Sequence, residues 1–270
     1  MNNIGKNYFD IGYLDVLAGG SSFLHRLDPR AKLITSLVFI VMVVSFDKYA
    51  FSALLPFFIY PVALVSIGGL PVRYLLRKIL LVSPFALLVG IFNPFIDREI
   101  VLRVGGVGIP GGWVSYLSIL IRFFLTVSAA FILIATTGFN AVCDSLIKLG
   151  VPRPFVVQLL FFHRYIFILT DEAERMVRAR QLRTFDTRLM GFKVFVALVS
   201  NLLLRTLDRA ERIYRAMCCR GFDGRVRMIR TMKITGKEIG FAWGWIFMFV
   251  FFRCFNVPLI FGELITGALK

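Results

Sequence analysis

Two arginine-rich segments contain the side chains that are best suited to bind a charged partner. They read AERMVRARQLRTFD at residues 173–186 and AERIYRAMCCRGFD at residues 210–223. Aligned over 171–186 and 208–223, the two copies are identical at nine of sixteen positions. An arginine offers a planar fork of donors that matches a carboxylate. The repeat therefore predicts two equivalent docking points for acidic groups, as a dimeric or pseudo-dimeric partner would present.

Four arginines of the repeat have an acid one helical turn earlier, a spacing at which an ion pair contributes about 0.2–0.5 kcal/mol. The predicted pairs are Asp171 with Arg175, Glu174 with Arg178, Asp208 with Arg212, and Glu211 with Arg215. Arg183 and Arg220 have Ala179 and Ala216 at that position instead. We therefore expect Arg183 and Arg220 to bind a partner. Ala179 and Ala216 are small, so the surface of that partner can approach closely.

The residues after these two arginines indicate where the helices end. Gly221 follows Arg220 as the usual C′ residue, and Phe222 is placed to fold back onto Met217 in a Schellman turn. Thr184 takes the glycine position in the first copy, so that end is marked less clearly. An arginine that only caps the helix dipole is the alternative interpretation for each end.

The helices that carry the repeat belong to an apolar chain. Of its 270 residues 58% are hydrophobic and 18% charged, with a net charge of +16, and the mean hydropathy is +0.77. Such a composition is typical of an integral membrane protein. The basic excess fits the positive-inside rule. It does not predict nucleic-acid binding, because no recognition motif accompanies the basic residues, which lie between membrane segments.

Five apolar runs predict the membrane core, and two more lead into the repeat. The five are 33–46, 51–67, 79–95, 113–136 and 239–255. Basic connections at 25–32, 71–78 and 138–237 predict a cytoplasmic N-terminus, whereas the neutral connection 96–112 predicts an external hairpin. Runs 155–170 and 192–204 continue into the two copies without a helix breaker, which predicts two helices of about 30 residues.

These elements predict an all-α integral membrane protein with about five to six transmembrane helices and two long cytoplasmic coupling helices. Residues 1–137 form the N-terminal segment and transmembrane core in this interpretation. Residues 138–235 form the cytoplasmic coupling-helix module, and residues 236–270 form the C-terminal transmembrane helix.

A second diagnostic stretch, SSFLHRLDPRAKL at residues 21–33, precedes the first apolar run and is called the N-terminal motif below. Asp28 is a suitable N-cap and Pro29 a suitable first residue for the helix that follows. We expect Arg26, Arg30 and Lys32 to hold the start of this helix at the cytoplasmic surface. Anionic lipid headgroups or the cytosol are the expected surroundings of Arg225, Arg227, Arg230 and Lys233. We expect His25 to pack or to form hydrogen bonds, because no acid–histidine cluster accompanies it.

The chain resembles the transmembrane T component of energy-coupling factor transporters. The stretches 15–33 (DVLAGGSSFLHRLDPRAKL) and 220–225 (RGFDGR) are most similar to its cobalt and nickel branch, CbiQ. The resemblance implies a multi-pass protein of a bacterial or archaeal plasma membrane. It also implies that the coupling helices dock on two ABC-type ATPase subunits, and that the membrane part holds a substrate-capture subunit for uptake of cobalt, or nickel, toward cobalamin biosynthesis.

In that family each coupling helix carries an X-Arg-X motif, often Ala-Arg-Gly or Ala-Arg-Ser, that enters a groove on one ATPase. The matching positions are Leu182-Arg183-Thr184 and Cys219-Arg220-Gly221. Both depart from the common triplet at the first residue, and the first copy also departs at the third. Ala179-Arg180-Gln181 is a rival match for the first copy; the internal repeat favours Arg183.

The remaining residues predict no catalytic, cofactor or metal site. The sequence has no GxxxxGK[ST] loop, so we expect no ATP hydrolysis by this chain. The four cysteines have no CxxC spacing. The main alternative is a permease that binds and translocates its substrate itself. It would need polar residues within the spans, where Arg122 and Asn93 are the main candidates. A membrane enzyme would need a nucleophile–base pair, and the sequence indicates none.

Overall fold

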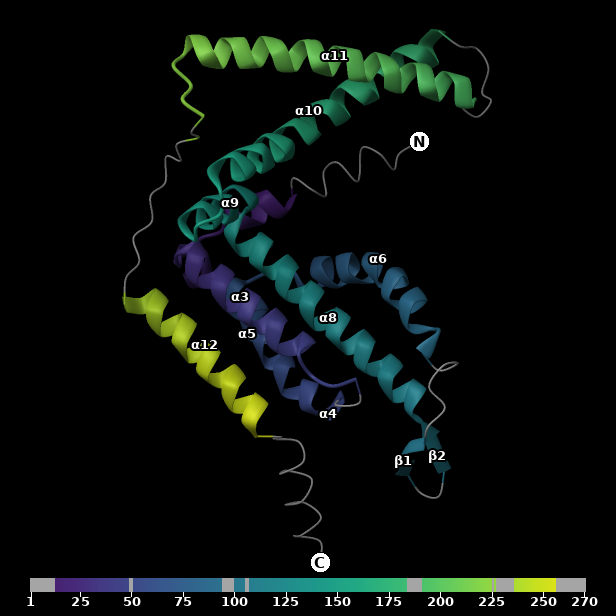
Figure 1. Cartoon of the computed structure of the whole chain (residues 1–270), viewed down its shortest axis with the longest axis vertical. Coiled ribbons are helices and arrows are strands. Elements are labelled where there is room, and N and C mark those ends of the chain that lie inside the picture. The colour runs from purple at the N-terminus through teal and green to yellow at the C-terminus, as the bar shows by residue number, and fades with distance from the viewer. Residues whose placement is uncertain are drawn as a thin grey trace, which may run out of the picture. The chain divides into compact units, whose positions relative to one another are not determined.

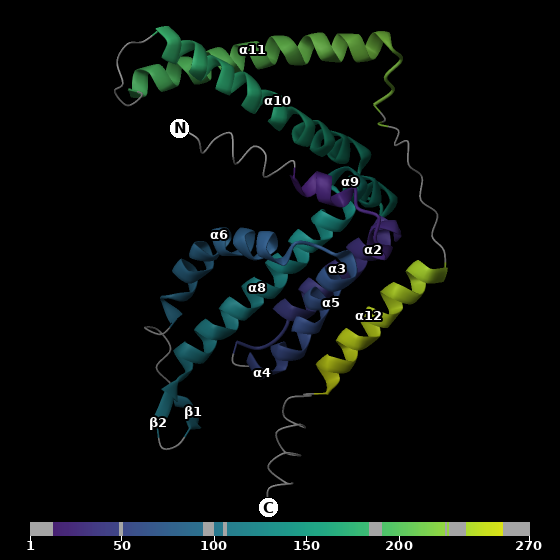
Figure 2. The same ribbon diagram turned by 180° about the vertical axis from the view of Figure 1, so that it is seen from behind.

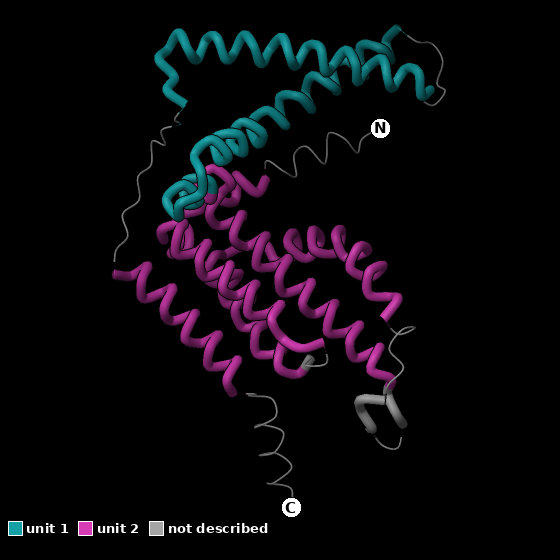
Figure 3. Tube along the Cα trace, in the orientation of Figure 1, with its two compact units in different colours: residues 1–12, 143–231 teal, residues 13–142, 232–270 magenta. Residues whose placement is uncertain are grey.

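The computed structural model describes residues 13–48, 51–93, 100–104, 107–183, 191–224, 226 and 236–255. The chain forms two compact units (Figure 3), one of residues 13–142 and 232–270 and the other of residues 1–12 and 143–231. The predicted functional division at residues 137 and 235 is not tested by these units and stays a prediction.

Helices make up almost all of the first unit. In chain order it contains α2 (Phe23–Arg26), α3 (Pro29–Val44), α4 (Phe51–Leu54), the 3-10 helix η1 (Leu55–Phe58), α5 (Ile59–Gly68), α6 (Val72–Gly90), α8 (Gly111–Thr137) and α12 (Gly236–Cys254). The exception is an antiparallel hairpin of β1 (Ile100–Val104) and β2 (Val107–Pro110). A hairpin within 96–112 was predicted and is confirmed, while its external position stays a prediction.

Helix α3 lies between α8 and α12 in both views (Figure 1, Figure 2). Its Phe39 is fully buried and lies at the centre of an aromatic core. The Phe39 ring stacks on Tyr60 of α5 at 4.5 Å between centroids and lies 5.3 Å from Phe249 of α12. The Tyr60 and Ser36 hydroxyls are 3.0 Å apart. This core joins α3, α5 and α12.

Helices α3 and α8 run antiparallel, as two contacts at opposite ends show. Lys32 near the start of α3 contacts Thr136 near the end of α8. Arg122, earlier in α8, donates to the carbonyl of Asp47 just after α3. Helix α6 packs on α8 as well, and there a Cβ on Gly90 would lie 2.7 Å from the Tyr116 ring. Close approach of α6 to α8 therefore requires glycine at position 90.

Among the described residues, two helices are long and apolar enough to cross a membrane, α8 and α10 (Arg153–Arg183). Ser52–Gly68 forms a shorter apolar stretch. Most residues in the apolar parts of α8 and α10 are not buried within the chain, whereas the core helix of a soluble protein is covered. The helical membrane fold was predicted and is confirmed; the number of five to six spans stays a prediction.

Candidate docking site

Helices α10 (Arg153–Arg183) and α11 (Phe192–Cys219) carry the two copies of the repeat. They contain 31 and 28 residues, or about 46 Å and about 42 Å at 1.5 Å per residue. Pro152 and Pro154 flank the start of α10, and Gly191 is the extended N-cap of α11. Neither helix contains an internal glycine or proline after these residues, so both continue unbroken into their arginine ends, as predicted.

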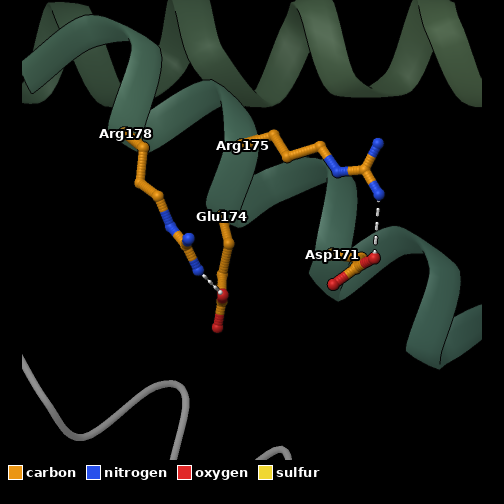
Figure 4. Close-up of polar contacts among 4 residues, drawn as sticks. All are labelled: Asp171, Glu174, Arg175 and Arg178. Atoms are coloured by element: carbon orange, nitrogen blue, oxygen red, sulfur yellow. Dashed lines mark hydrogen bonds and ion pairs between the residues drawn. The ribbon is translucent and has the colours of Figure 1, made fainter. Parts of the chain in front are cut away.

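Three of the four predicted ion pairs within these helices are formed. Figure 4 shows Arg175 bonded to Asp171 at 3.1 Å and Arg178 bonded to Glu174 at 2.8 Å. On α11, Arg215 lies 3.0 Å from Glu211.

The fourth predicted pair, Asp208 with Arg212, is wrong, because these two described residues form no ion pair with each other within 4.0 Å. Both side chains are exposed. At such sites the gain of a few tenths of a kcal/mol is comparable to the side-chain entropy that a fixed pair loses.

The two helices cross in antiparallel directions. Arg205 of α11 bonds to Glu172 of α10 at 2.8 Å, and the Phe161 ring lies 6.4 Å from that of Phe222, just after α11. Moving back along α10 therefore means moving forward along α11, as Figure 1 shows for the same two helices. The arginine ends point away from each other along the pair.

This crossing separates Arg183 from Arg220. Arg183 lies eleven residues beyond Glu172, about 16 Å along α10, and Arg220 lies fifteen residues beyond Arg205, about 22 Å along α11. Because the two directions oppose each other, the arginines are about 30–40 Å apart. Both side chains are exposed, and neither forms an ion pair with another residue that the structure describes.

The end of α11 is closed as the sequence predicted. The Phe222 N–H donates to the Met217 carbonyl at 3.0 Å, and the Gly221 N–H donates to the Cys218 carbonyl at 3.0 Å. Gly221 has φ of 74°, which glycine adopts without strain. Arg220 is the C-cap residue of α11, so this Schellman turn fixes its backbone position.

The other predicted docking residues surround the two arginines. Ala179 and Ala216 are exposed one turn before Arg183 and Arg220, so both arginines lie beside open, small-residue surface. Gly221 is also exposed. Thr184 lies outside the described residues. The rival arginine of the first copy, Arg180, is half-buried.

Helix α11 also has a large uncovered apolar surface. None of its residues is fully buried. Its N-terminal half exposes Phe192, Phe195, Val196, Val199, Leu203, Leu204 and Leu207, each by at least 44%. A contiguous exposed apolar surface is characteristic of contact with a partner or a lipid.

The N-terminal motif begins α3 in the predicted way. The Asp28 Oδ1 accepts a hydrogen bond from the Arg30 N–H at 2.9 Å, and Pro29 is the first helical residue. The Asp28 side chain is only 2% exposed. Arg26 is exposed and Arg30 half-buried.

His25 packs and forms hydrogen bonds, as predicted. Its Nε2 lies 3.0 Å from the Leu17 carbonyl, which only accepts, so Nε2 carries the proton. Its Nδ1 then accepts from the Ser22 hydroxyl at 2.6 Å. Burial lowers the pKa of His25 below its ordinary value and the Lys32 charge lowers it further, while the Leu17 and Ala135 carbonyls act in the opposite direction.

Lys32, expected at the cytoplasmic surface, is covered by other residues of the chain, and its depth in a membrane stays a prediction. Lys32 is 4% exposed, and its Nζ donates to the carbonyl of Thr136 in the last turn of α8 at 2.9 Å. The partial negative charge at a helix C-terminus attracts a cation, which explains why the ammonium lies inside the helix bundle. Sequence reasoning missed this contact because 104 residues separate the partners.

The Glu172–Arg205 bond was also missed, although the sequence holds a signal for it. Glu172 has Met176 rather than a base four residues later, and Arg205 has Asn201 four residues earlier. Both residues lie a similar number of residues from the 184–190 connection. An acid and a base that lack a partner at the i to i+4 spacing, and that lie at similar distances from a turn, can pair across antiparallel helices.

Among the described residues, no three His, Cys, Asp or Glu side chains are grouped to hold a metal ion. The two polar residues named for a substrate path both have internal partners. Asn93 Nδ2 lies 3.0 Å from the Ser115 hydroxyl, and Arg122 binds the Asp47 carbonyl.

Comparison with known proteins identifies related chains over most of the length. A model of the family CbiQ, cobalt transport protein, matches residues 20–230. That range contains the N-terminal motif and both arginine helices.

Several curated relatives carry the name energy-coupling factor transporter transmembrane protein EcfT. The Ruminiclostridium cellulolyticum relative is 26% identical over 257 residues, covering 86% of this chain and 96% of its own. The Bacillus subtilis relative is 28% identical and covers 81% and 88%. The Exiguobacterium sibiricum relative is 30% identical and covers 82% and 90%.

The lowered pKa of His25 predicts a loss of stability on acidification. A histidine whose folded-state pKa lies below the unfolded value of 6.5 contributes fully above pH 6.5, and this contribution is lost as pH falls toward the folded-state pKa. Thermal unfolding in detergent should therefore show a lower midpoint at pH 5.5 than at pH 7.5. His25→Gln should flatten this dependence, since an amide donates to Leu17 without titrating.

His163→Gln is the matched control, because it removes the other histidine and leaves the N-terminal motif intact. A pH dependence that is the same in His25→Gln as in the unsubstituted protein would contradict this assignment.

Proposed function

The chain belongs to the CbiQ family of cobalt transport proteins, and we propose that it is the transmembrane coupling subunit of an energy-coupling factor transporter. One observation carries this proposal. Two unbroken helices cross and present equivalent exposed arginines, Arg183 and Arg220, about 30–40 Å apart. The named relatives are transmembrane proteins of such transporters.

The partners at the arginine ends are two ABC-type ATPase subunits in the cytoplasm. Each arginine enters an acidic groove on one subunit, and Ala179 or Ala216 lets the groove wall approach. A charge-assisted hydrogen bond contributes about 1.5–3 kcal/mol. The wide separation of Arg183 and Arg220 supports one subunit for each helix end rather than one groove for both.

The partner at the apolar surface of α11 is a membrane subunit that captures the substrate, together with lipid. The exposed side chains from Phe192 to Leu207 support this assignment, because a surface of that size is costly in water. Substrate identity then resides in the capture subunit, and the CbiQ family favours cobalt as the transported ion.

The mechanism is mechanical. ATP binding closes the ATPase pair and moves its two grooves together. Helices α10 and α11, each held near its C-terminal end, convert this movement into tilting or sliding at the membrane. The apolar surface toward the capture subunit rearranges, and the ion is released inward. This is a two-state coupling of rigid bodies in which the chain itself catalyses nothing.

A permease that binds its own substrate is the alternative. It requires polar groups available inside the spans. Arg122 and Asn93 are the candidates, and their bonds to Asp47 and Ser115 support structural roles instead.

The proposed location is a bacterial or archaeal plasma membrane, with the N-terminus and residues 138–235 cytoplasmic and the 96–112 connection external. The alternation of basic and neutral connections motivates this orientation. Single cysteines at Leu182 and Gly106, on a cysteine-free background, should be labelled differently by an impermeant maleimide in intact cells. Labelling is expected at Gly106→Cys alone, and labelling at Leu182→Cys alone would reverse the orientation.

Replacing the two arginines should release the ATPase. Each single change, Arg183→Ala or Arg220→Ala, should weaken assembly about tenfold or more, because it leaves a groove carboxylate unpaired. The double change should abolish transport. Arg→Lys should rescue poorly, since a point charge does not replace a bidentate fork. Pull-down of the ATPase by detergent-solubilised variants measures assembly directly.

The matched control is the double change Arg178→Ala with Arg215→Ala, because these arginines are on the same helices and already bind Glu174 and Glu211. It should retain the ATPase. Loss of the ATPase in this control, with retention in the Arg183/Arg220 double variant, would place the docking contact elsewhere. The exposed thiols of Cys218 and Cys219 give a second readout, since docking at Arg220 should shield them from maleimide.

A further inference from the structure

A single residue, Gly138, joins helix α8 to the next helix, which leads toward α10 and α11. Helix α8 ends at Thr137 and α9 (Phe139–Lys148) begins at Phe139. Gly138 between them has φ of 78°. Its N–H closes α8 on the Ile134 carbonyl, and its own carbonyl accepts from Val142 in α9. A glycine at the junction of two helices can absorb rotation, so this joint needs external support to stay rigid.

The residues before α3 supply that support from both sides of the joint. Lys32 Nζ binds the Thr136 carbonyl on the α8 side at 2.9 Å. Asp15 Oδ1 accepts from the Phe139 N–H on the α9 side at 3.4 Å. Between them, a Cβ on Gly138 would lie 3.2 Å from the Ala18 side chain. Residues 13–33, called the clamp below, thus contact the last turn of α8, the joint and the first residue of α9.

The clamp is held together by its own hydrogen bonds. His25 is 8% exposed and bonds to both Leu17 and Ser22. A Cβ on Gly20 would lie 2.9 Å from the His25 ring, so the chain passes directly over the imidazole. These contacts fix the turn between Asp15 and Lys32, the two residues that hold the joint.

A need for stability does not by itself explain why a lysine is buried at position 32. An ammonium group loses most of its hydration at 4% exposure. An apolar side chain of similar size often packs at a buried charged position with equal or better stability. What an apolar residue cannot supply is a directed bond to the Thr136 carbonyl. That bond ties α3 to the end of α8, close to the glycine joint.

We propose that the clamp locks the Gly138 joint, so that α9 and α8 move as one body, and that Lys32 is its main positioning residue. This inference rests on the proposed function, in which movement begins at the docking ends. Helix α9 continues through residues 149–152 into α10, and a second Schellman turn closes that connection, with the Val151 N–H bonded to the Leu146 carbonyl at 3.0 Å. With the joint locked, displacement of α10 reaches α8 and α3. With the joint released, the coupling helices swing and the membrane helices stay in place.

The test is the coupling ratio of the complete transporter, reconstituted in proteoliposomes with its ATPases and capture subunit. Co²⁺ uptake and ATP hydrolysis are measured together, and assembly is measured by pull-down. Lys32→Met should assemble and hydrolyse ATP like the unsubstituted complex. Its uptake per ATP should fall about fivefold or more, because losing a charge-assisted hydrogen bond shifts a two-state joint by about an order of magnitude.

Asp15 provides a graded comparison at the other side of the joint. Asp15→Asn keeps an oxygen that accepts from Phe139, and Asp15→Ala removes it. Uptake per ATP should stay close to that of the unsubstituted complex in Asp15→Asn and fall in Asp15→Ala. If Lys32→Met does not fold, the Asp15 variants still test whether the clamp couples ATP hydrolysis to uptake. Equal coupling in the alanine and asparagine variants would overturn the clamp.

A distance measurement on the chain alone separates the clamp from the proposed function. Spin labels at Leu117 of α8 and Leu149 just after α9, both exposed positions, report the angle at Gly138. The clamp predicts a narrow distance distribution that broadens in Asp15→Ala and Lys32→Met. An unchanged distribution would refute the clamp even in a working transporter. Failure of the unsubstituted chain to copurify with an ATPase would instead refute the proposed function.

Discussion

Helices α10 and α11 each continue without a break from an apolar start to a charged end, and this continuity fixes how far the arginines lie from the apolar residues. A helix of about 30 residues holds its two ends at a fixed separation, whereas a loop at its centre would let them move independently. The same backbone therefore joins side chains suited to lipid or a membrane partner to arginines suited to a cytoplasmic one. The antiparallel crossing places the two copies of the repeat so that their arginine ends face apart.

The contacts that stabilise α10 and α11 differ from those that stabilise the helices of the first unit, residues 13–142 and 232–270. Helix α3 is fixed by a dense aromatic core around Phe39. The described contacts between α10 and the segment from α11 to Phe222 include the Glu172–Arg205 ion pair and the Phe161–Phe222 ring contact, which contribute little individually. Their uncovered apolar and cationic surfaces are consistent with a module whose stability is completed by its partners. Covering these surfaces with a partner would stabilise the assembled complex.

Features set by neighbouring residues could be predicted from the sequence. Gly191 and Gly221 mark the ends of α11, the Asp28-Pro29 pair marks the start of α3, and the i to i+4 spacing marks three ion pairs. Each depends on backbone geometry within one or two helical turns. Arg183 and Arg220 could be identified as candidates because they occupy matched positions of the repeat and have alanine, rather than an acid, one helical turn earlier.

Features set by the packing of distant segments could not be predicted in this way. A lysine next to a membrane helix has the same sequence signature whether it reaches the headgroups or the C-terminus of another helix, and Lys32 does the latter. The Asp15–Phe139 contact depends likewise on the position of α8 relative to the N-terminal motif. Local spacing can also mislead: Asp208 and Arg212 have the spacing of a helical ion pair but form none. On an exposed surface the spacing permits an ion pair without requiring it.

In the proposed complex one chain holds two ATPase subunits, one at each arginine end. Photocrosslinking measures this stoichiometry when a photoreactive residue is placed at both Leu182 and Cys219, which are exposed beside Arg183 and Arg220. The assembled complex is then irradiated and the products are resolved by mass. The expected product contains one copy of this chain and two ATPase subunits. A doubly labelled chain that captures a single ATPase subunit, or none, would contradict it.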